Sequence, residues 1–171
     1  MKRILALLLV LSSVSFAQIR IQERSFVKHD TTNGAYTAGD YIGDSTYLYF
    51  NGAETRGTIR AVIITTDTNN VANSTFRLYL FGDTTGHGTI PDDNVAYILS
   101  IKDSVNYIGQ IATNALTIAG AGATMCASTT IIDPPLAYET KNGKMFGVLT
   151  ALAAYVPKYQ GRIRVKIIFG E

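Results

Sequence analysis

The stretch RIRVKIIF at residues 162–169 alternates charged and apolar side chains over most of its length. Successive side chains of a β-strand point to opposite faces, so a period of two predicts a half-buried strand. Its inner face is predicted to carry Ile163, Val165, Ile167 and Phe169, and its outer face Arg162, Arg164 and Lys166. One face of this strand therefore packs on a core while the other meets solvent.

The same period recurs upstream, in residues 19–22, 47–50, 58–66 and 75–81. The pattern predicts that Ile59, Ala61 and Ile63 share one face, and that Phe76, Leu78 and Leu80 share another. Shorter apolar runs at 95–101, 116–119, 125–132 and 146–156 add further candidate strands. The Ala and Leu content of the last run tolerates a helix, but its shortness and the glycine at position 147 favour a strand.

Turn signals separate these runs. The expected breaks are Asn33-Gly34, Asn51-Gly52, residues 67–70, Gly82-Asp83, Asp133-Pro134-Pro135 and Asn142-Gly143. Residues 141–144, Lys-Asn-Gly-Lys, predict a type I′ hairpin between two strands. About eight to ten short strands at such spacing predict an all-β fold, a single antiparallel β-sandwich of jelly-roll-like form, with a closed barrel as the open alternative.

The N-terminus has the layout of a secretory signal peptide. A basic Met1-Lys2-Arg3 precedes an apolar run from Ile4 to Val14, and Ser15-Phe16-Ala17 places small residues before Gln18. The run is shorter than the roughly 20 residues that span a bilayer. We therefore predict a signal peptide, or a hydrophobic N-terminal arm, at 1–17, cleavage after Ala17, and one β-sandwich domain at 18–171. The cleaved chain is expected to have no stable membrane span and to be a virion component or secreted.

Charge and cysteine content narrow the function classes. The chain carries 15 Lys and Arg and 13 Asp and Glu, for a formal charge of +2. Lys2 and Arg3 account for that excess, so the segment after residue 17 is neutral, and no nucleic-acid partner is expected. The single cysteine, Cys126, lies in an apolar run and is expected to be buried.

No catalytic site is evident in the sequence. His29 and His87 are the only histidines, neither is near a Gly-x-Ser-x-Gly motif, and both are expected in loops. No cofactor is expected either. The one alternative is calcium, which prefers oxygen ligands, and its candidate ligands are Asp83, Asp92, Asp93 and Asn94. The competing interpretation is that residues 91–94 form a simple turn.

Ten tyrosines recur at positions expected to face outward, where they could form an interface or stack on sugars. They are Tyr36, Tyr41, Tyr47, Tyr49, Tyr79, Tyr97, Tyr107, Tyr138, Tyr155 and Tyr159. Ordinary packing on the second face of a sheet is the alternative.

The order of several short motifs resembles a family of small β-sandwich virion structural proteins of tailed phages, of the minor-capsid or decoration type. The resemblance covers most of residues 35–170. Its motifs are residues 36–43, 56–62, 76–81, 90–97, 135–136 and 145–150. It implies a non-enzymatic role in self-association or attachment to a particle, without catalytic residues.

Two functions are compatible with the sequence. The first is a non-enzymatic structural subunit, of a virion (capsid or decoration) or of an extracellular surface assembly, that self-associates into homo-oligomers or particles. The second is a secreted module that binds carbohydrate or a surface, suggested by the tyrosines and the 83–94 loop. A secreted hydrolase is the least favoured.

Overall fold

The computed structural model describes residues 20–27, 34–43, 47–51, 54–83, 90–154, 156–157 and 161–170. In the first strand only the backbone and the Ile21 side chain are described. Several sequence predictions fall outside these ranges, namely the leader 1–17, His29, His87, Tyr155 and Tyr159.

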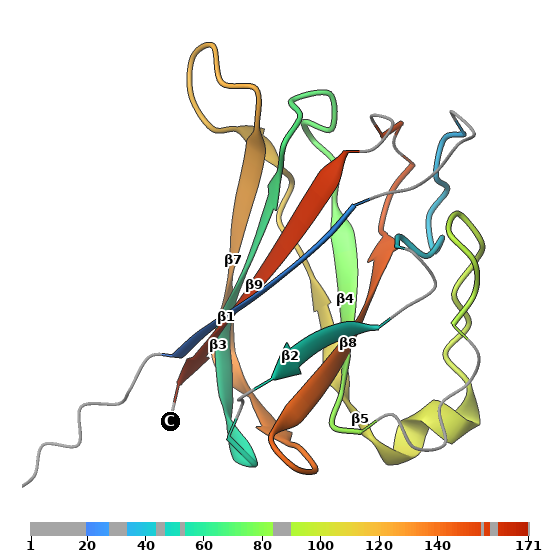
Figure 1. Ribbon diagram of the computed structural model, residues 1–171, viewed down its shortest axis with the longest axis vertical. Coiled ribbons are helices and arrows are strands. Elements are labelled where there is room, and N and C mark those ends of the chain that lie inside the picture. Colours follow the sequence, from blue (N-terminus) through green and yellow to red (C-terminus); the bar gives the residue numbers. More distant parts are fainter. Residues whose placement is uncertain are drawn as a thin grey trace, which may run out of the picture.

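Within the described residues the chain forms nine strands and one short 3₁₀ helix, arranged as two facing sheets (Figure 1). The five-stranded sheet has the order β1-β9-β3-β7-β6 and the four-stranded sheet the order β2-β8-β4-β5. The elements are β1 Arg20–Val27, β2 Leu48–Asn51, β3 Arg56–Thr66, β4 Phe76–Phe81, η1 Ile101–Val105, β5 Tyr107–Ala112, β6 Thr117–Ile118, β7 Cys126–Glu139, β8 Lys144–Ala151 and β9 Arg162–Gly170.

The strand pairs nest around the centre of the chain. β4 pairs with β5, β3 with β7, β2 with β8 and β1 with β9, all antiparallel. Such a chain is one long hairpin wrapped into two sheets, which is the connectivity of a jelly roll. The predicted all-β, jelly-roll-like sandwich is therefore confirmed, as two sheets rather than one closed barrel.

The core lies between the two sheets. β4 contributes Phe76, Leu78 and Leu80, each fully buried. β9 contributes Ile163, Val165, Ile167 and Phe169, as its alternation predicts. Burial of a large apolar side chain stabilises the fold by about 1.5–3 kcal/mol. These two strands therefore hold the sheets together much as the sequence indicates.

The predicted face of β3 is wrong beyond its fourth residue. The core cluster contains Ile59, Val62 and Ile64; Ala61 is buried but is not part of this cluster, and Ile63 is only half-buried. The partner in β7 jumps from Leu136 opposite Ile59 to Ile131 opposite Ala61, so that residues 132–135 stand opposite Arg60 alone. An irregularity of this kind reverses the faces of every later residue, because side chains alternate with a period of two.

The same irregularity corrects a second prediction. Asp133-Pro134-Pro135 was expected to end a strand, but β7 continues through it to Glu139. Proline has no backbone N–H to donate, but Pro134 and Pro135 lie in the irregularity, where residues 132–135 have no partner in β3, and so the ladder loses no hydrogen bond.

Two further expectations change in part. Asn142 and Gly143 both have positive φ, as a type I′ turn requires, yet β7 and β8 lie in different sheets and do not form a hairpin. The run 95–101 is not a strand; most of it is irregular and its end begins η1. The run from 146 begins as a strand, β8, as predicted, but the strand ends at Ala151 and does not continue to 156.

Candidate functional site

The outer face of the four-stranded sheet carries an aromatic cluster. Tyr41, Phe81, Phe146 and Val148 are buried there, although they lie outside the main core. Phe146 is the centre, with the rings of Tyr49 at 4.9 Å and Tyr47 at 6.1 Å, both edge-on. Edge-to-face contacts at these separations are favourable. This outer face is therefore a second, smaller core and not a solvated surface.

The tyrosines divide into groups that the sequence did not separate. Tyr36, Tyr41 and Tyr138 are buried, which contradicts the prediction that they face outward. The half-buried tyrosines, Tyr47, Tyr79, Tyr97 and Tyr107, pack on the outer cluster. Among the tyrosines that the structure describes, Tyr49 alone is exposed. Alternation assigned these residues to a face, but it could not show that loops cover that face.

Burial changes the acidity of the tyrosines in this cluster. It raises the pKa of Tyr47 to about 12, helped by the negative charge of Asp103. Burial also raises the pKa of Tyr97, again with a contribution from Asp103. For Tyr107 the pKa rises through burial and Tyr79, against a lowering by Arg77. These phenols are thus neutral at ordinary pH and present aromatic surface and hydroxyl donors rather than charge.

The connection between β4 and β5 covers part of this cluster. The ring of Tyr97 lies 5.2 Å from that of Tyr79, which is on the outer face of β4. Backbone hydrogen bonds from Tyr41 N to Val95 O and from Tyr97 N to Gly39 O tie the connection to residues 39–41. The connection is therefore fixed at several points along its length.

A buried carboxylate fixes the end of this connection. Asp103 is only 2% exposed, and its Oδ2 accepts hydrogen bonds from Ser100 N at 2.7 Å and from Ser100 Oγ at 2.8 Å. The Asp103 N–H in return donates to the Ser100 carbonyl. This reciprocal Ser-x-x-Asp arrangement works like a capping box at the start of η1. It sets the orientation of the side chains on either side.

Large apolar side chains of this connection are turned to solvent. Ile98, Ile101 and Val105 are 80%, 85% and 82% exposed, and Val95 and Leu99 are also exposed. We name the set Val95, Ile98, Leu99, Ile101 and Val105 the loop surface. Scattered apolar residues on a surface are ordinary, but a group of large ones within one short segment is a candidate contact site. The sequence pattern does not reveal this surface, because the apolar run 95–101 has the composition of a strand.

The calcium candidates are not gathered in one place. Asp92, Asp93 and Asn94 form a turn, in which Val95 N donates to Asp92 O. Asp93 Oδ1 accepts from Tyr36 Oη at 2.6 Å and from Gly43 N at 3.2 Å. Asp83 instead follows the far end of β4, where its Oδ2 lies 3.4 Å from Lys141 Nζ. Calcium binding by the three turn residues stays a prediction.

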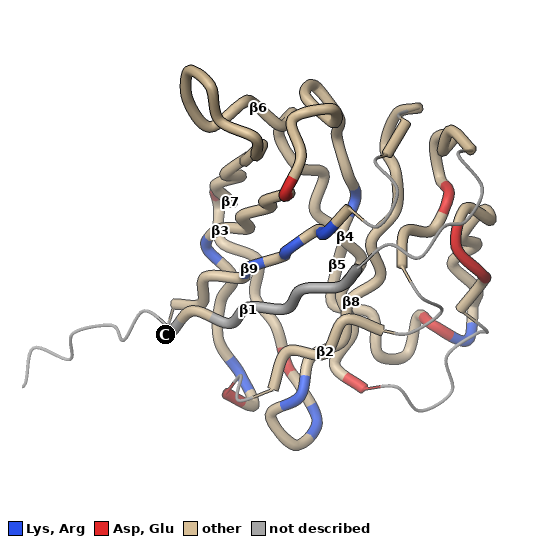
Figure 2. Tube along the Cα trace, turned by 45° about the horizontal axis from the view of Figure 1, so that its top comes forward, with Lys and Arg blue, Asp and Glu red and all other residues tan. Residues whose placement is uncertain are grey.

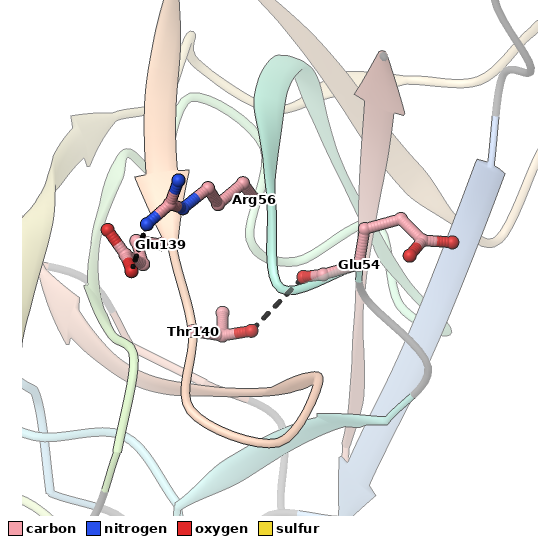
Figure 3. A network of polar contacts seen from close by, with 4 residues as sticks. All are labelled: Glu54, Arg56, Glu139 and Thr140. Atoms are coloured by element: carbon pink, nitrogen blue, oxygen red, sulfur yellow. Dashed lines mark hydrogen bonds and ion pairs between the residues drawn. The ribbon is translucent and has the colours of Figure 1, made fainter.

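An open groove of about 790 Å³ lies at the end of the sandwich where Asp83 is found. Its walls include Gly57, Val105 and Tyr138. On its rim Arg56 Nη2 lies 3.1 Å from Glu139 Oε1, and Thr140 Oγ1 donates to Glu54 O at 3.1 Å (Figure 3). Both charged side chains are mostly exposed, and ion pairs of this kind contribute little stability. The described part of this groove thus offers a charged rim.

The cysteine, possible metal ligands and possible membrane-spanning helices can be assessed within the described ranges. Cys126 is fully buried, as predicted, and burial raises the pKa of its thiol. No three His, Cys, Asp or Glu residues of the described part lie close enough together to hold a metal ion. Among the helices that can be described, none is long and apolar enough to cross a membrane.

Comparisons with known proteins give structural likenesses alone. A scan of protein-family models finds no match, and the comparison with curated proteins finds none either. Of the solved structures, a chain of Tomato Aspermy Virus is 9% identical with a TM-score of 0.34, covering 90% of this chain and 78% of its own. A chain of the native Kashmir bee virus virion is 13% identical with a TM-score of 0.33, covering 89% and 70%. A chain of the Israeli acute paralysis virus particle is 8% identical with a TM-score of 0.31, covering 91% and 72%.

At these identities and TM-scores, the assignment of fold and function depends on the chain's own geometry. The resemblance to tailed-phage virion proteins stays a hypothesis.

Proposed function

We propose that this chain is a non-enzymatic structural subunit that assembles with copies of itself, as part of a virion (capsid or decoration) or of an extracellular surface layer. The observation that carries the proposal is the loop surface, which exposes five apolar side chains on an anchored segment. Burying such side chains between subunits removes apolar area from water at about 25 cal/mol per Å². A group of this kind is typical of a contact surface.

The fold is compatible with this role without requiring it. Double-sheet jelly rolls occur in viral capsid proteins and also in lectins, and a fold by itself does not define a function. The two sheets form a rigid base, and the loop surface lies on the connection at the centre of the nested strand pairs. A subunit needs such a base, because its contact residues must be held in place before association.

The test is molar mass as a function of concentration, measured by light scattering on the full chain. We expect the wild type to form oligomers or particles. The double variant Ile98→Ser, Ile101→Ser should lose them, while the Val156→Ser variant, altered at an exposed apolar residue outside the loop surface, should keep them. A wild type that stays monomeric at all accessible concentrations contradicts the proposal.

The intact mass of protein from its native source separates the two forms of this proposal. A large assembly of chains that begin at Met1 favours a virion subunit, in which residues 1–17 are a hydrophobic arm. A large assembly of chains that begin at Gln18 favours an extracellular layer, because cleavage after Ala17 follows export.

The second candidate, a carbohydrate- or surface-binding module, has one observation in its favour. Tyr49 is exposed beside Phe146 on the aromatic cluster, where a sugar ring could stack. Glycan-array binding that is lost in Tyr49→Ala supports this candidate. The absence of binding to any glycan removes it.

A further inference from the structure

The turn between β3 and β4 contains an acceptor sequence for N-linked glycosylation. Asn73-Ser74-Thr75 fits the pattern Asn-x-Ser/Thr, and it is the only such triplet among the 171 residues. Triplets of this kind also arise by chance, so the place of Asn73 in the fold decides whether a sugar fits there. The oligosaccharide is bulky and stays in solvent, and a usable acceptor therefore lies on the surface.

Asn73 meets this requirement. Its side chain is exposed, whereas Ser74 after it is buried. The backbone around it is held in place, because Asn73 N donates to Leu116 O at 2.8 Å and Leu116 N donates to Ser74 O at 2.9 Å. The side-chain amide of Asn73 makes no hydrogen bond within the residues that the structure describes. A sugar on Asn73 Nδ2 thus breaks no contact of the described fold.

The turn by itself explains asparagine at position 73 but not the whole triplet. The φ of Asn73 is +68°, a left-handed conformation in which Asn is enriched. Thr75, in contrast, uses its backbone carbonyl, which accepts from Leu152 N at 2.9 Å. Within the described part of the chain its hydroxyl makes no hydrogen bond, although this hydroxyl is what completes the acceptor sequence.

The end of the sandwich around Asn73 lacks charged side chains. Residues 68–76 and 113–125, which we name the neutral end, contain no Lys, Arg, Asp or Glu. Figure 2 shows both segments as uncharged loops at the top of the view. The two segments lie side by side, since Asn69 Nδ2 donates to Ala123 O at 3.3 Å. Charged side chains keep a surface soluble, and a hydrated oligosaccharide can serve in their place.

We propose that Asn73 carries an N-linked oligosaccharide in the exported protein, where it shields the neutral end. The inference rests on the exported form of the proposed function, because this modification belongs to secreted proteins and the predicted signal peptide at 1–17 supplies the route. The donor is an oligosaccharide linked to a lipid through pyrophosphate. Asn73 Nδ2 bonds to C1 of the first sugar, the C1–O bond to the pyrophosphate breaks, and Nδ2 loses one proton, without any oxidation or reduction.

A glycan at Asn73 leaves part of the loop surface accessible for self-assembly. Asn73 precedes Phe76, the first residue of β4. The helix η1 instead leads into Tyr107 of β5, which pairs with Phe81 at the other end of β4. Figure 1 likewise shows the β3–β4 turn and η1 at opposite ends of the sandwich. Glycosylation at one end and subunit contact through η1 at the other are therefore compatible.

The first test is the intact mass of protein from its native source, before and after treatment with an N-glycosidase. We expect a chain heavier than its polypeptide by one oligosaccharide, and the excess should disappear on treatment. A mass equal to that of the polypeptide alone overturns the inference, whether the chain begins at Met1 or at Gln18. If those bare chains form large assemblies, the proposed function stands; if glycosylated chains stay monomeric, the proposed function falls and the inference stands.

The second test places the sugar by substitution, with the full chain produced in secreting eukaryotic cells. Asn73→Gly suits the positive φ and should lose the mass shift completely. Thr75→Ala should lose it as well, whereas Thr75→Ser keeps a hydroxyl and should retain it. Asn70→Gln, an exposed change in the same turn, is the matched control and should leave the shift unchanged. A wild type that these cells retain or secrete without sugar, or an Asn73→Gly variant that keeps the shift, overturns the inference.

Discussion

Replacing Asp103 by alanine should loosen the segment that carries the loop surface. The carboxylate accepts two hydrogen bonds from Ser100, at 2.7 and 2.8 Å, while it is almost fully buried. Hydrogen bonds to a charged group contribute about 1.5–3 kcal/mol each. Two of them give about 3–6 kcal/mol in all.

Two effects offset part of that loss. Alanine removes the cost of keeping a carboxylate out of water. Ser100 is half-buried, so its N–H and hydroxyl can turn to solvent once the carboxylate is gone. We expect a net destabilisation of about 2 kcal/mol, within the range for a lost cap. With a urea m-value of about 2 kcal/mol/M, the unfolding midpoint falls by about 1 M.

The assay is urea unfolding followed by tyrosine fluorescence, with light scattering on the same samples before denaturant is added. Asp103→Asn keeps an acceptor oxygen and should lose about half as much. Lys102→Ala, an exposed change in the same helix, should move the free energy of unfolding by less than about 0.5 kcal/mol. If Asp103→Ala unfolds and assembles like Lys102→Ala, the carboxylate does not hold the segment and the reasoning fails.

Three further predictions concern other parts of the fold. The pKa of Tyr47 is raised to about 12 from 10.0, so the folded state holds the phenolic proton more tightly, and this contribution to stability is complete below pH about 10 and is lost towards pH 12. In Tyr47→Phe, the urea midpoint should therefore fall less steeply between these pH values than in the wild type, and equal slopes would contradict this. Gly82→Ala would press a Cβ against the backbone oxygen of Glu139 and should cost more, by thermal melting, than Gly109→Ala, whose Cβ meets only flexible side-chain atoms. The buried Cys126 thiol should react with a disulfide reagent only after denaturant is added, and rapid reaction in buffer would show that the site opens.

The strands that were predicted well are those whose two faces meet different environments without interruption. β4 and β9 alternate cleanly, and both faces are as predicted. The predicted face of β3 is wrong after Arg60, because the irregularity in the ladder depends on the partner strand, and the sequence of β3 alone does not reveal it. The prediction that Pro134 and Pro135 end a strand is wrong for the same reason.

The candidate site was less predictable than the fold. The run from Val95 to Ile101 is apolar, and apolarity usually means burial, so it was interpreted as a strand. The signal that could have corrected this is Ser100 followed three residues later by Asp103, a helix-start pattern just inside the run. Tyr36 and Tyr41 were placed outside, since the sequence does not show which loops cover which sheet.

The position of β9 in its sheet has a consequence for biosynthesis. Although it is made after the other eight strands, it lies between β1 and β3, not at an edge. Until its residues leave the ribosome, β1 lacks its partner and β3 lacks one of its two ladders. The growing chain therefore carries an unfilled slot flanked by unpaired backbone, which invites pairing with other nascent chains. Completion of the sheet is necessarily a late event, and factors that shield the slot during translation should raise the yield of folded protein.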